Sequence, residues 1–270
     1  MRNQPMKHLV ALGVLLAALA CPTTTRADLE VHSGWDLLWT QPGTQFMGDP
    51  FVGVPLGTFD FGSGSVYVGA TDTIVHRLAN ATVPGPVPPS QSTTIPVQMD
   101  ALQLASAVPI SFGGGPLGTY FVTLQSVRGG PVSGGSMTIG FDSQVGEPYT
   151  TPHGTFSSTW DIFFDVRFGA LNGPIVYSDD LALSSTAQPW VHYQPDPYTL
   201  VIEGVNYLLK GDGTINQDFW PVAGTIIEES HEQMLALHRV IPVPEPTSGL
   251  LAVLGIALFG LNQYRRKFAR

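Results

Sequence analysis

Two carboxylates on one predicted strand, Asp161 and Asp165, are the first residues whose type could support acid–base chemistry. Residues four apart in a strand lie about 13 Å apart, whereas a glycosidase needs its two carboxyl groups within about 5 to 9.5 Å. Asp165 and Arg167 are two residues apart on the same face, with about 7 Å between their Cα atoms. The spacing therefore favours a surface ion pair over a catalytic pair.

Two stretches partly match metal-binding patterns. Alternate polar residues from Asp212 to Asp218 resemble the first half of a calcium loop, but Gln217 replaces the required Gly and Ala223 the required Glu. His231-Glu232 begins a zinc-protease-like pattern, yet the next histidine, His238, is too far along the chain to share one zinc. No phosphate loop, dinucleotide fingerprint or serine-nucleophile motif occurs. The sequence therefore assigns no catalytic, cofactor or metal residue, and calcium held between loops stays open.

A group of aromatic residues offers a possible sugar contact. Trp190, Tyr193 and Tyr198 lie among three prolines, which interrupt strand pairing and could present flat rings on a loop. Aromatic rings on a β domain provide the large, flat surface against which a sugar face can stack. We take these three residues as candidate glycan contacts, with the alternative that their rings pack over the edge of a sheet.

Charge and cysteine content limit the partners of the chain. Cys21 is the only cysteine, so a chain cleaved after it has neither a disulfide nor thiolate chemistry. Residues 28–244 hold twenty Asp and Glu against five Lys and Arg, a net charge of −15. Such a surface repels polyanions, so nucleic acid is not an expected partner.

The N-terminus has the pattern of a secretory signal peptide. Two basic residues precede an apolar run from Leu9 to Ala20. Cleavage after Ala20 and cleavage after Ala27 both fit the small-residue rule, and we favour Ala27 because Asp28 opens a strand-like sequence. The expected signal is therefore residues 1–27, removed by signal peptidase.

The last twenty-eight residues, 243–270, combine three features. Val243, Pro244, Glu245 and Pro246 should be extended, because each proline fixes φ and lacks an N–H. Residues 247–264 carry no charge, and eighteen helical residues reach about 27 Å, close to the about 30 Å of a bilayer core. Arg265, Arg266 and Lys267 follow, and such a cluster stays on the cytoplasmic side. The pattern predicts a membrane stop.

This tail resembles the PEP-CTERM sorting signal of exported proteins of Gram-negative-type bacteria. The resemblance rests on Pro244-Glu245-Pro246, the short apolar run and the terminal basic cluster, about a tenth of the chain. It implies retention in the inner membrane, processing near Pro-Glu-Pro by an exosortase, and delivery to the cell surface or the exopolysaccharide matrix. It implies nothing about the activity of the body.

The body, residues 28–242, is predicted to be one all-β domain. Turn residues recur every eight to twelve positions, and Thr159–Phe168 alternates apolar and polar residues strictly. The pattern favours a jelly-roll-like β-sandwich, with a closed barrel as the alternative. We expect Gln41–Pro50 to be a loop, Ile175–Tyr177 a short strand, and Glu228–Ile241 a strand in preference to a helix.

The expected function is that of a non-enzymatic surface or matrix component, with signal peptidase, exosortase and the inner membrane as partners. Extracellular polysaccharide is the expected contact, because that is the polymer of the compartment. Two alternatives stay open: a carbohydrate-binding module for exopolysaccharide, and a β-sandwich hydrolase acting on polysaccharide.

Overall fold

The computed structural model describes residues 29–83, 92–141, 154–192, 199–206, 208–209, 215–216, 219–222, 225–229 and 236–243. Strand is the main regular structure of these residues, which confirms the prediction of an all-β body. The predicted signal peptide, and the tail from Pro244 onward, lie outside the described residues.

The described regular structure consists of strands and two short 3-10 helices. In chain order they are β1 (Leu29–Val31), β2 (Gly34–Thr40), β3 (Gln45–Phe46), β4 (Asp49–Gly53), β5 (Gly57–Asp60), β6 (Ser65–Gly69), β7 (Thr73–Arg77), β8 (Ala81–Val83), β9 (Ser92–Ser106), η1 (Phe112–Gly114), β10 (Tyr120–Leu124), η2 (Gln125–Arg128), β11 (Gly134–Phe141), β12 (Gly154–Phe168), β13 (Ile175–Val191), β14 (Leu208–Leu209), β15 (Ile215–Asn216), β16 (Trp220–Pro221), β17 (Thr225–Glu229) and β18 (Leu237–Pro242). Among the described residues, no helix is long and apolar enough to cross a membrane.

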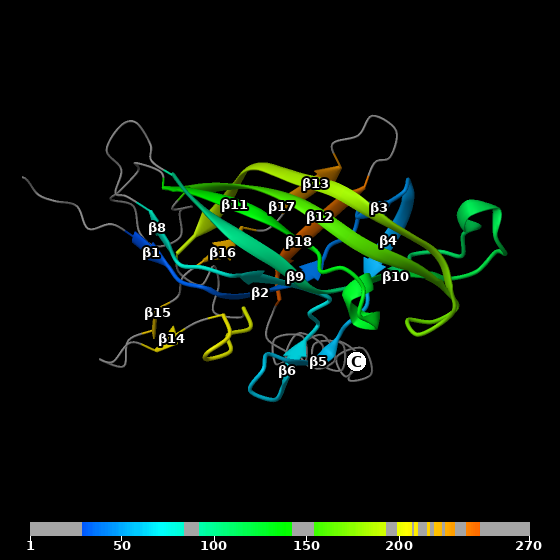
Figure 1. Ribbon diagram of the computed structural model, residues 1–270, viewed down its shortest axis with the longest axis horizontal. Coiled ribbons are helices and arrows are strands. Elements are labelled where there is room, and N and C mark those ends of the chain that lie inside the picture. The colour runs from blue at the N-terminus through cyan, green and yellow to red at the C-terminus, as the bar shows by residue number, and fades with distance from the viewer. Residues whose placement is uncertain are drawn as a thin grey trace, which may run out of the picture.

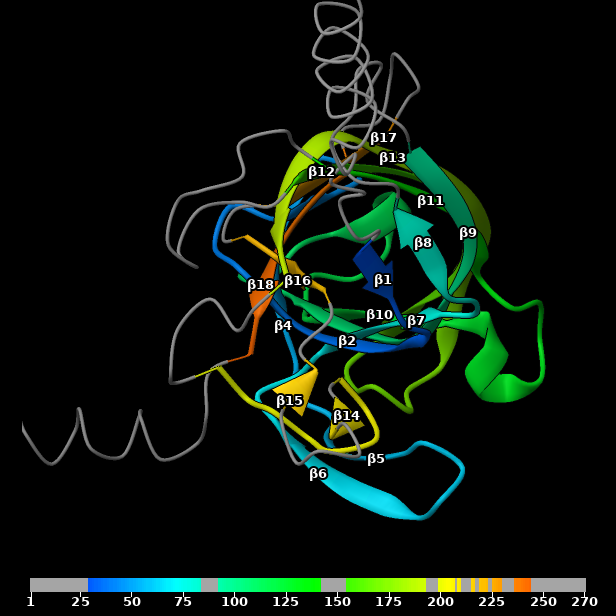
Figure 2. The ribbon, with the colours of Figure 1, turned by 90° about the vertical axis from the view of Figure 1, so that its left-hand side faces the viewer.

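Twelve strands form one antiparallel sheet whose pairings return to their starting point. The long strands β9 and β12 are joined by β11 at one end and by β10 at the other. From β12 the pairings continue through β13, β17, β18, β2 and β7 back to β9. Viewed end-on, the sheet encloses its core (Figure 2), and the long strands run the length of the molecule (Figure 1). Two layers face each other as in the predicted sandwich, but hydrogen bonds join them into one sheet.

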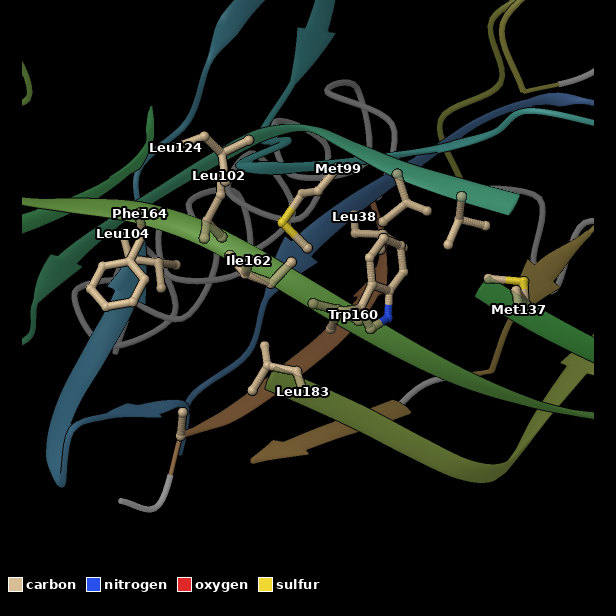
Figure 3. Packing of buried hydrophobic residues seen from close by; sticks show 14 of the residues in the cluster. Leu38, Met99, Leu102, Leu104, Leu124, Met137, Trp160, Ile162, Phe164 and Leu183 are labelled. Atoms are coloured by element: carbon tan, nitrogen blue, oxygen red, sulfur yellow. The ribbon is translucent and has the colours of Figure 1, made fainter. Parts of the chain in front are cut away.

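The core is built from the inward-facing side chains of this sheet. Trp160, Ile162, Phe164 and Val166 of β12 are all at most 3% exposed, as the alternation in the sequence predicts. They meet side chains from β2, β9, β10, β11 and β13 in one cluster (Figure 3). Burial of a large apolar side chain stabilises by about 1.5 to 3 kcal/mol, so this single strand contributes strongly to the fold.

A second, smaller cluster lies on the outer face of β2, β7 and β9. Leu37, Ile74 and Ala101 point outward from these strands and pack against Val68, Val205 and Val243. The β5–β6 hairpin and residues 199–206 therefore form an extra layer over this part of the sheet. Asp60 Oδ1 stabilises the hairpin turn by accepting from the N–H groups of Gly62 (2.8 Å) and Gly64 (3.1 Å).

Three predicted elements differ from the observed ones. Gln41–Pro50, predicted as a loop, contains β3 and the start of β4. β13 runs from Ile175 to Val191, far beyond the predicted Ile175–Tyr177. Its polar residues do not alternate with apolar ones, so the sequence does not indicate a long strand, but pairing with β12 stabilises it. Glu228–Ile241, predicted as one strand, is strand in preference to helix at both of its described ends, but Glu228 and Glu229 end β17 whereas β18 begins at Leu237, and the two strands pair antiparallel. The fold extends one residue past the expected boundary, to Val243.

Candidate functional site

Of the three candidate glycan contacts, Trp190 is buried in the core. Its ring is 0% exposed and stacks on Phe219 with 5.2 Å between ring centroids, while Nε1 donates to the carbonyl oxygen of Gly140 (3.0 Å). The expectation that Trp190 is presented on a loop is therefore wrong, because Trp190 lies on strand β13 and its ring is part of the core. Pro189 suggested a loop, but it lies within β13 opposite Thr155 of β12, and its carbonyl oxygen accepts from the N–H of Val222 (3.0 Å). Tyr193 and Tyr198 lie outside the described residues.

Asp165 forms an ion pair with Arg167, but the prediction of a surface pair is wrong, because the Asp165 side chain is 0% exposed. Asp165 also forms a second, stronger ion pair that the sequence did not reveal. Arg167 Nη2 lies 3.4 Å from Asp165 Oδ2, whereas Arg128 binds both carboxylate oxygens, at 2.7 and 3.0 Å. Ser178 Oγ also donates to Oδ1 (2.6 Å). Burial alone would raise the pKa of Asp165, but the hydrogen bonds from Arg128 and Ser178 and the two positive charges outweigh it and lower the pKa. Arg128 lies in η2, 37 residues before Asp165 in the chain, so no local pattern links the three. Asp161, on the same strand, is exposed.

Asp72 is a second buried carboxylate, and it has no cation beside it among the described residues. Its oxygens accept from the N–H of Thr40 (2.8 Å), the hydroxyl of Thr40 (2.6 Å) and the hydroxyl of Thr73 (2.8 Å). Burial raises the pKa of Asp72 to about 6, although these hydrogen bonds lower it in part. Gly53 leaves the space that the carboxylate fills, since a Cβ there would lie 1.7 Å from Oδ2.

His238 completes this network from β18. Its Nε2 lies 2.9 Å from Thr40 Oγ1, and because the Thr40 hydroxyl proton is donated to Asp72, Nε2 must carry the proton and donate. Burial lowers the pKa of His238 to about 4, so the ring is neutral at pH 7. The neighbouring cavity is about 30 Å³, room for about two water molecules, which is too small for a sugar. The network therefore joins β2, β7 and β18 and does not form a substrate site.

A partly buried group of aromatic and polar side chains lies on the outer face of β2, β7 and β9. Trp35 stacks on His76 with 4.2 Å between centroids, and its Nε1 donates to Asp100 Oδ2 (2.8 Å). His76 Nδ1 lies 3.4 Å from the same oxygen, and Gln98 donates to Asp100 Oδ1 (2.6 Å). Burial lowers the pKa of His76, Asp100 opposes this shift, and Arg77 adds to it. We call Trp35, His76, Gln98 and Asp100 the outer-face cluster.

The outer-face cluster combines groups that suit a polyhydroxylated ligand. An aromatic ring offers an apolar face, and carboxylate, amide and imidazole groups exchange hydrogen bonds with hydroxyls. Its members come from three strands up to sixty-five residues apart, so no short motif could have revealed it. Only the register, which sets Trp35 opposite His76 and His76 opposite Gln98, brings them together.

The predicted processing motif begins at the edge of the fold. Val243, its first residue, is 1% exposed and is bonded to β2 and to residues 199–206 through its backbone. Pro244, Glu245, Pro246 and the basic cluster Arg265, Arg266 and Lys267 lie outside the described residues. Within the described part of the chain, no three His, Cys, Asp or Glu side chains gather closely enough to hold a metal ion.

Comparison of the chain with protein-family models, with curated proteins and with solved structures found no match.

Proposed function

We propose that this chain is an exported bacterial protein of the cell surface or extracellular matrix. A signal peptide starts its export, the C-terminal tail holds it in the inner membrane, and an exosortase processes that tail. The mature form is a non-enzymatic, acidic, β-sandwich-like body, jelly-roll-like in size.

The observation that carries this proposal is the position of Val243. The last of the described strands, β18, leads into this buried residue, and Pro244-Glu245-Pro246 is next in the sequence. At the other end, β1 begins at Leu29, two residues after Ala27, the favoured signal cleavage site. The body thus spans nearly all of the chain between the two predicted sorting segments.

The sorting proposal is tested in a bacterium that has an exosortase. The full chain and a variant with Pro244→Ala, Glu245→Ala and Pro246→Ala are expressed, and membrane and surface fractions are compared by immunoblotting. The proposal expects a shortened chain at the surface for the natural sequence and an unshortened chain in the membrane for the variant. Equal size and location of the two chains would argue against it.

Carbohydrate binding is the second candidate function, and the outer-face cluster is the observation that favours it. Its test is a glycan array on the full chain, repeated with Trp35→Ala and with Phe163→Ala as a control. Phe163 is also a half-buried aromatic residue that points outward, but it lies on β12. Selective loss of a glycan signal with Trp35→Ala supports the site, and equal signals from both variants remove it.

The polysaccharide hydrolase alternative has less support. It needs two carboxylates that face each other across a cleft. The buried carboxylates of the described residues, Asp36, Asp72 and Asp165, all accept hydrogen bonds from the chain itself. We therefore place this alternative behind the other two.

A further inference from the structure

Val243 stands where the folded body meets the predicted sorting tail, and both of its backbone groups are bonded. Its N–H donates to the carbonyl oxygen of Leu37 (3.3 Å), and its carbonyl oxygen accepts from the N–H of Leu200 (2.7 Å). The side chain is 1% exposed and packs in the outer cluster with Leu37, Val68 and Val205. Val243 is therefore held between β2 and residues 199–206 like a residue inside a sheet.

The surroundings of Val243 restrict it further. Pro242 pairs with Leu38 of β2, and Pro244 limits the residue before it to extended conformations. The partner segment is itself fixed by Asn206, whose Oδ1 accepts from the N–H of Ile202 (2.7 Å) and whose Nδ2 donates to the carbonyl oxygen of Leu200 (2.9 Å). Each side of Val243 is thus supported by ordered chain.

A processing enzyme must pull the residues around the cleaved bond into its active site. For the bond between Pro242 and Val243, this would break both backbone hydrogen bonds and expose a buried side chain. We propose that Val243, although it begins the Val-Pro-Glu-Pro pattern, is the terminal anchor of the fold, and that processing cuts beyond it. The mature protein then keeps Val243. The part of this inference that concerns processing rests on the proposed function, whereas the anchor does not.

The anchor also limits the distance between the body and the membrane. Four residue steps separate Val243 from Thr247, where the predicted apolar run begins, and a fully extended chain covers at most about 14 Å in four steps. An enzyme that cuts within these steps acts directly beside the folded body. The layer formed by the β5–β6 hairpin and residues 199–206 packs around Val243 and is therefore the surface nearest to that enzyme.

Amide hydrogen exchange on the full chain tests the anchor directly. The N–H groups of Val243 and Leu200 are expected to exchange at least about 100-fold more slowly than unstructured amides, as strand amides do. Val243→Asn should remove the protection at Leu200, whereas Val108→Asn, at a valine that is 53% exposed, should leave it unchanged. Unprotected Val243 and Leu200 amides in the natural chain would overturn the inference.

Two insertions in the full chain locate the boundary of the fold. A Gly-Ser pair placed between Val243 and Pro244 leaves the anchor in position, so the Tm of the body should not change. The same pair placed between Pro242 and Val243 displaces the anchor, and the Tm should fall by several degrees. Equal Tm values for the two insertions would show that Val243 is not the anchor.

The mature C-terminus from cells that process the chain completes the test. A terminus beyond Val243 supports the inference, and a folded mature protein that ends at Val243 or earlier refutes it while leaving processing intact. If the tail is never removed, the proposed function fails, yet exchange and the two insertions still decide whether Val243 is the anchor.

Discussion

Asp72 and His238 share one hydrogen-bond network but respond to pH in opposite directions. The folded pKa of Asp72 is raised from 3.8 to about 6, so the folded state holds its proton more tightly and Asp72 adds stability as the pH falls from about 6 to 3.8. The folded pKa of His238 is lowered from 6.5 to about 4, so its contribution is complete above 6.5 and is lost as the pH falls to about 4. Between about pH 4 and 6 the two effects largely cancel.

Single substitutions should separate these two effects. When the pH is lowered from about 7 to about 4.5, the natural chain loses unfolding free energy because His238 becomes protonated more easily in the unfolded state. His238→Gln lacks this loss, so over the same pH change its unfolding free energy should rise by about 2 to 3 kcal/mol relative to that of the natural chain. Asp72→Asn lacks the stabilisation that Asp72 gains on protonation, so over the same pH change its unfolding free energy should fall by about 2 kcal/mol relative to that of the natural chain. Urea unfolding at the two pH values measures both, and a parallel pH dependence of all three chains would contradict the assignment.

Asp165 should matter to stability far more than its neighbour Asp161. Asp165→Asn leaves Arg128 and Arg167 without their counter-charge and should lower the unfolding free energy by about 2 kcal/mol at neutral pH. This loss is smaller than for a fully buried ion pair, because the Arg128 side chain is 42% exposed and solvent screens its charge. Because the folded pKa of Asp165 is lowered, its stabilisation is present above about pH 4, so the difference between variant and natural chain should shrink as the pH falls below that. Asp161→Asn, at an exposed position on the same strand, is the control and should change stability little. Equal effects of the two substitutions would contradict the structural role of Asp165.

At the scale of elements, β13 depends on Trp190, which connects it to β12 and to Phe219. Trp190→Ala should cost about 3 to 5 kcal/mol, the range for removing a large aromatic side chain from a core. Phe163→Ala, on the outer face of β12, should cost clearly less. Chemical denaturation of both variants measures the difference, and a cost at Trp190 no greater than that at Phe163 would contradict the buried position.

The strands that could be predicted are those in which apolar and polar residues alternate, because this pattern indicates which face is buried. Thr159–Phe168 alternates strictly because one face packs into the core and the other is polar. β13 could not be predicted in full, because Ser178, Asp179 and Asp180 make its first half polar on both faces and pairing with β12 holds it in place. The outer-face cluster was also beyond prediction, since Trp35, His76 and Asp100 become neighbours only through the register of three strands.

The twelve-stranded sheet closes through β18, the last strand of the described residues. β18 pairs with β17, β2 and β3, so the C-terminal strand joins elements from the start of the chain. A chain that ends at Glu229 lacks β18 and should lose cooperative unfolding, whereas a chain that ends at Val243 should keep it. Near-ultraviolet circular dichroism during thermal unfolding distinguishes them, and a cooperative transition in the shorter chain would contradict the closing role of β18.

Mass spectrometry of the surface-exposed protein from its native cells gives both ends of the mature chain. We expect a chain that begins at Asp28 and ends shortly beyond the body, with Val243 retained and the apolar run and Arg265-Arg266-Lys267 removed. A surface-exposed chain that still extends to Arg270 would contradict this expectation.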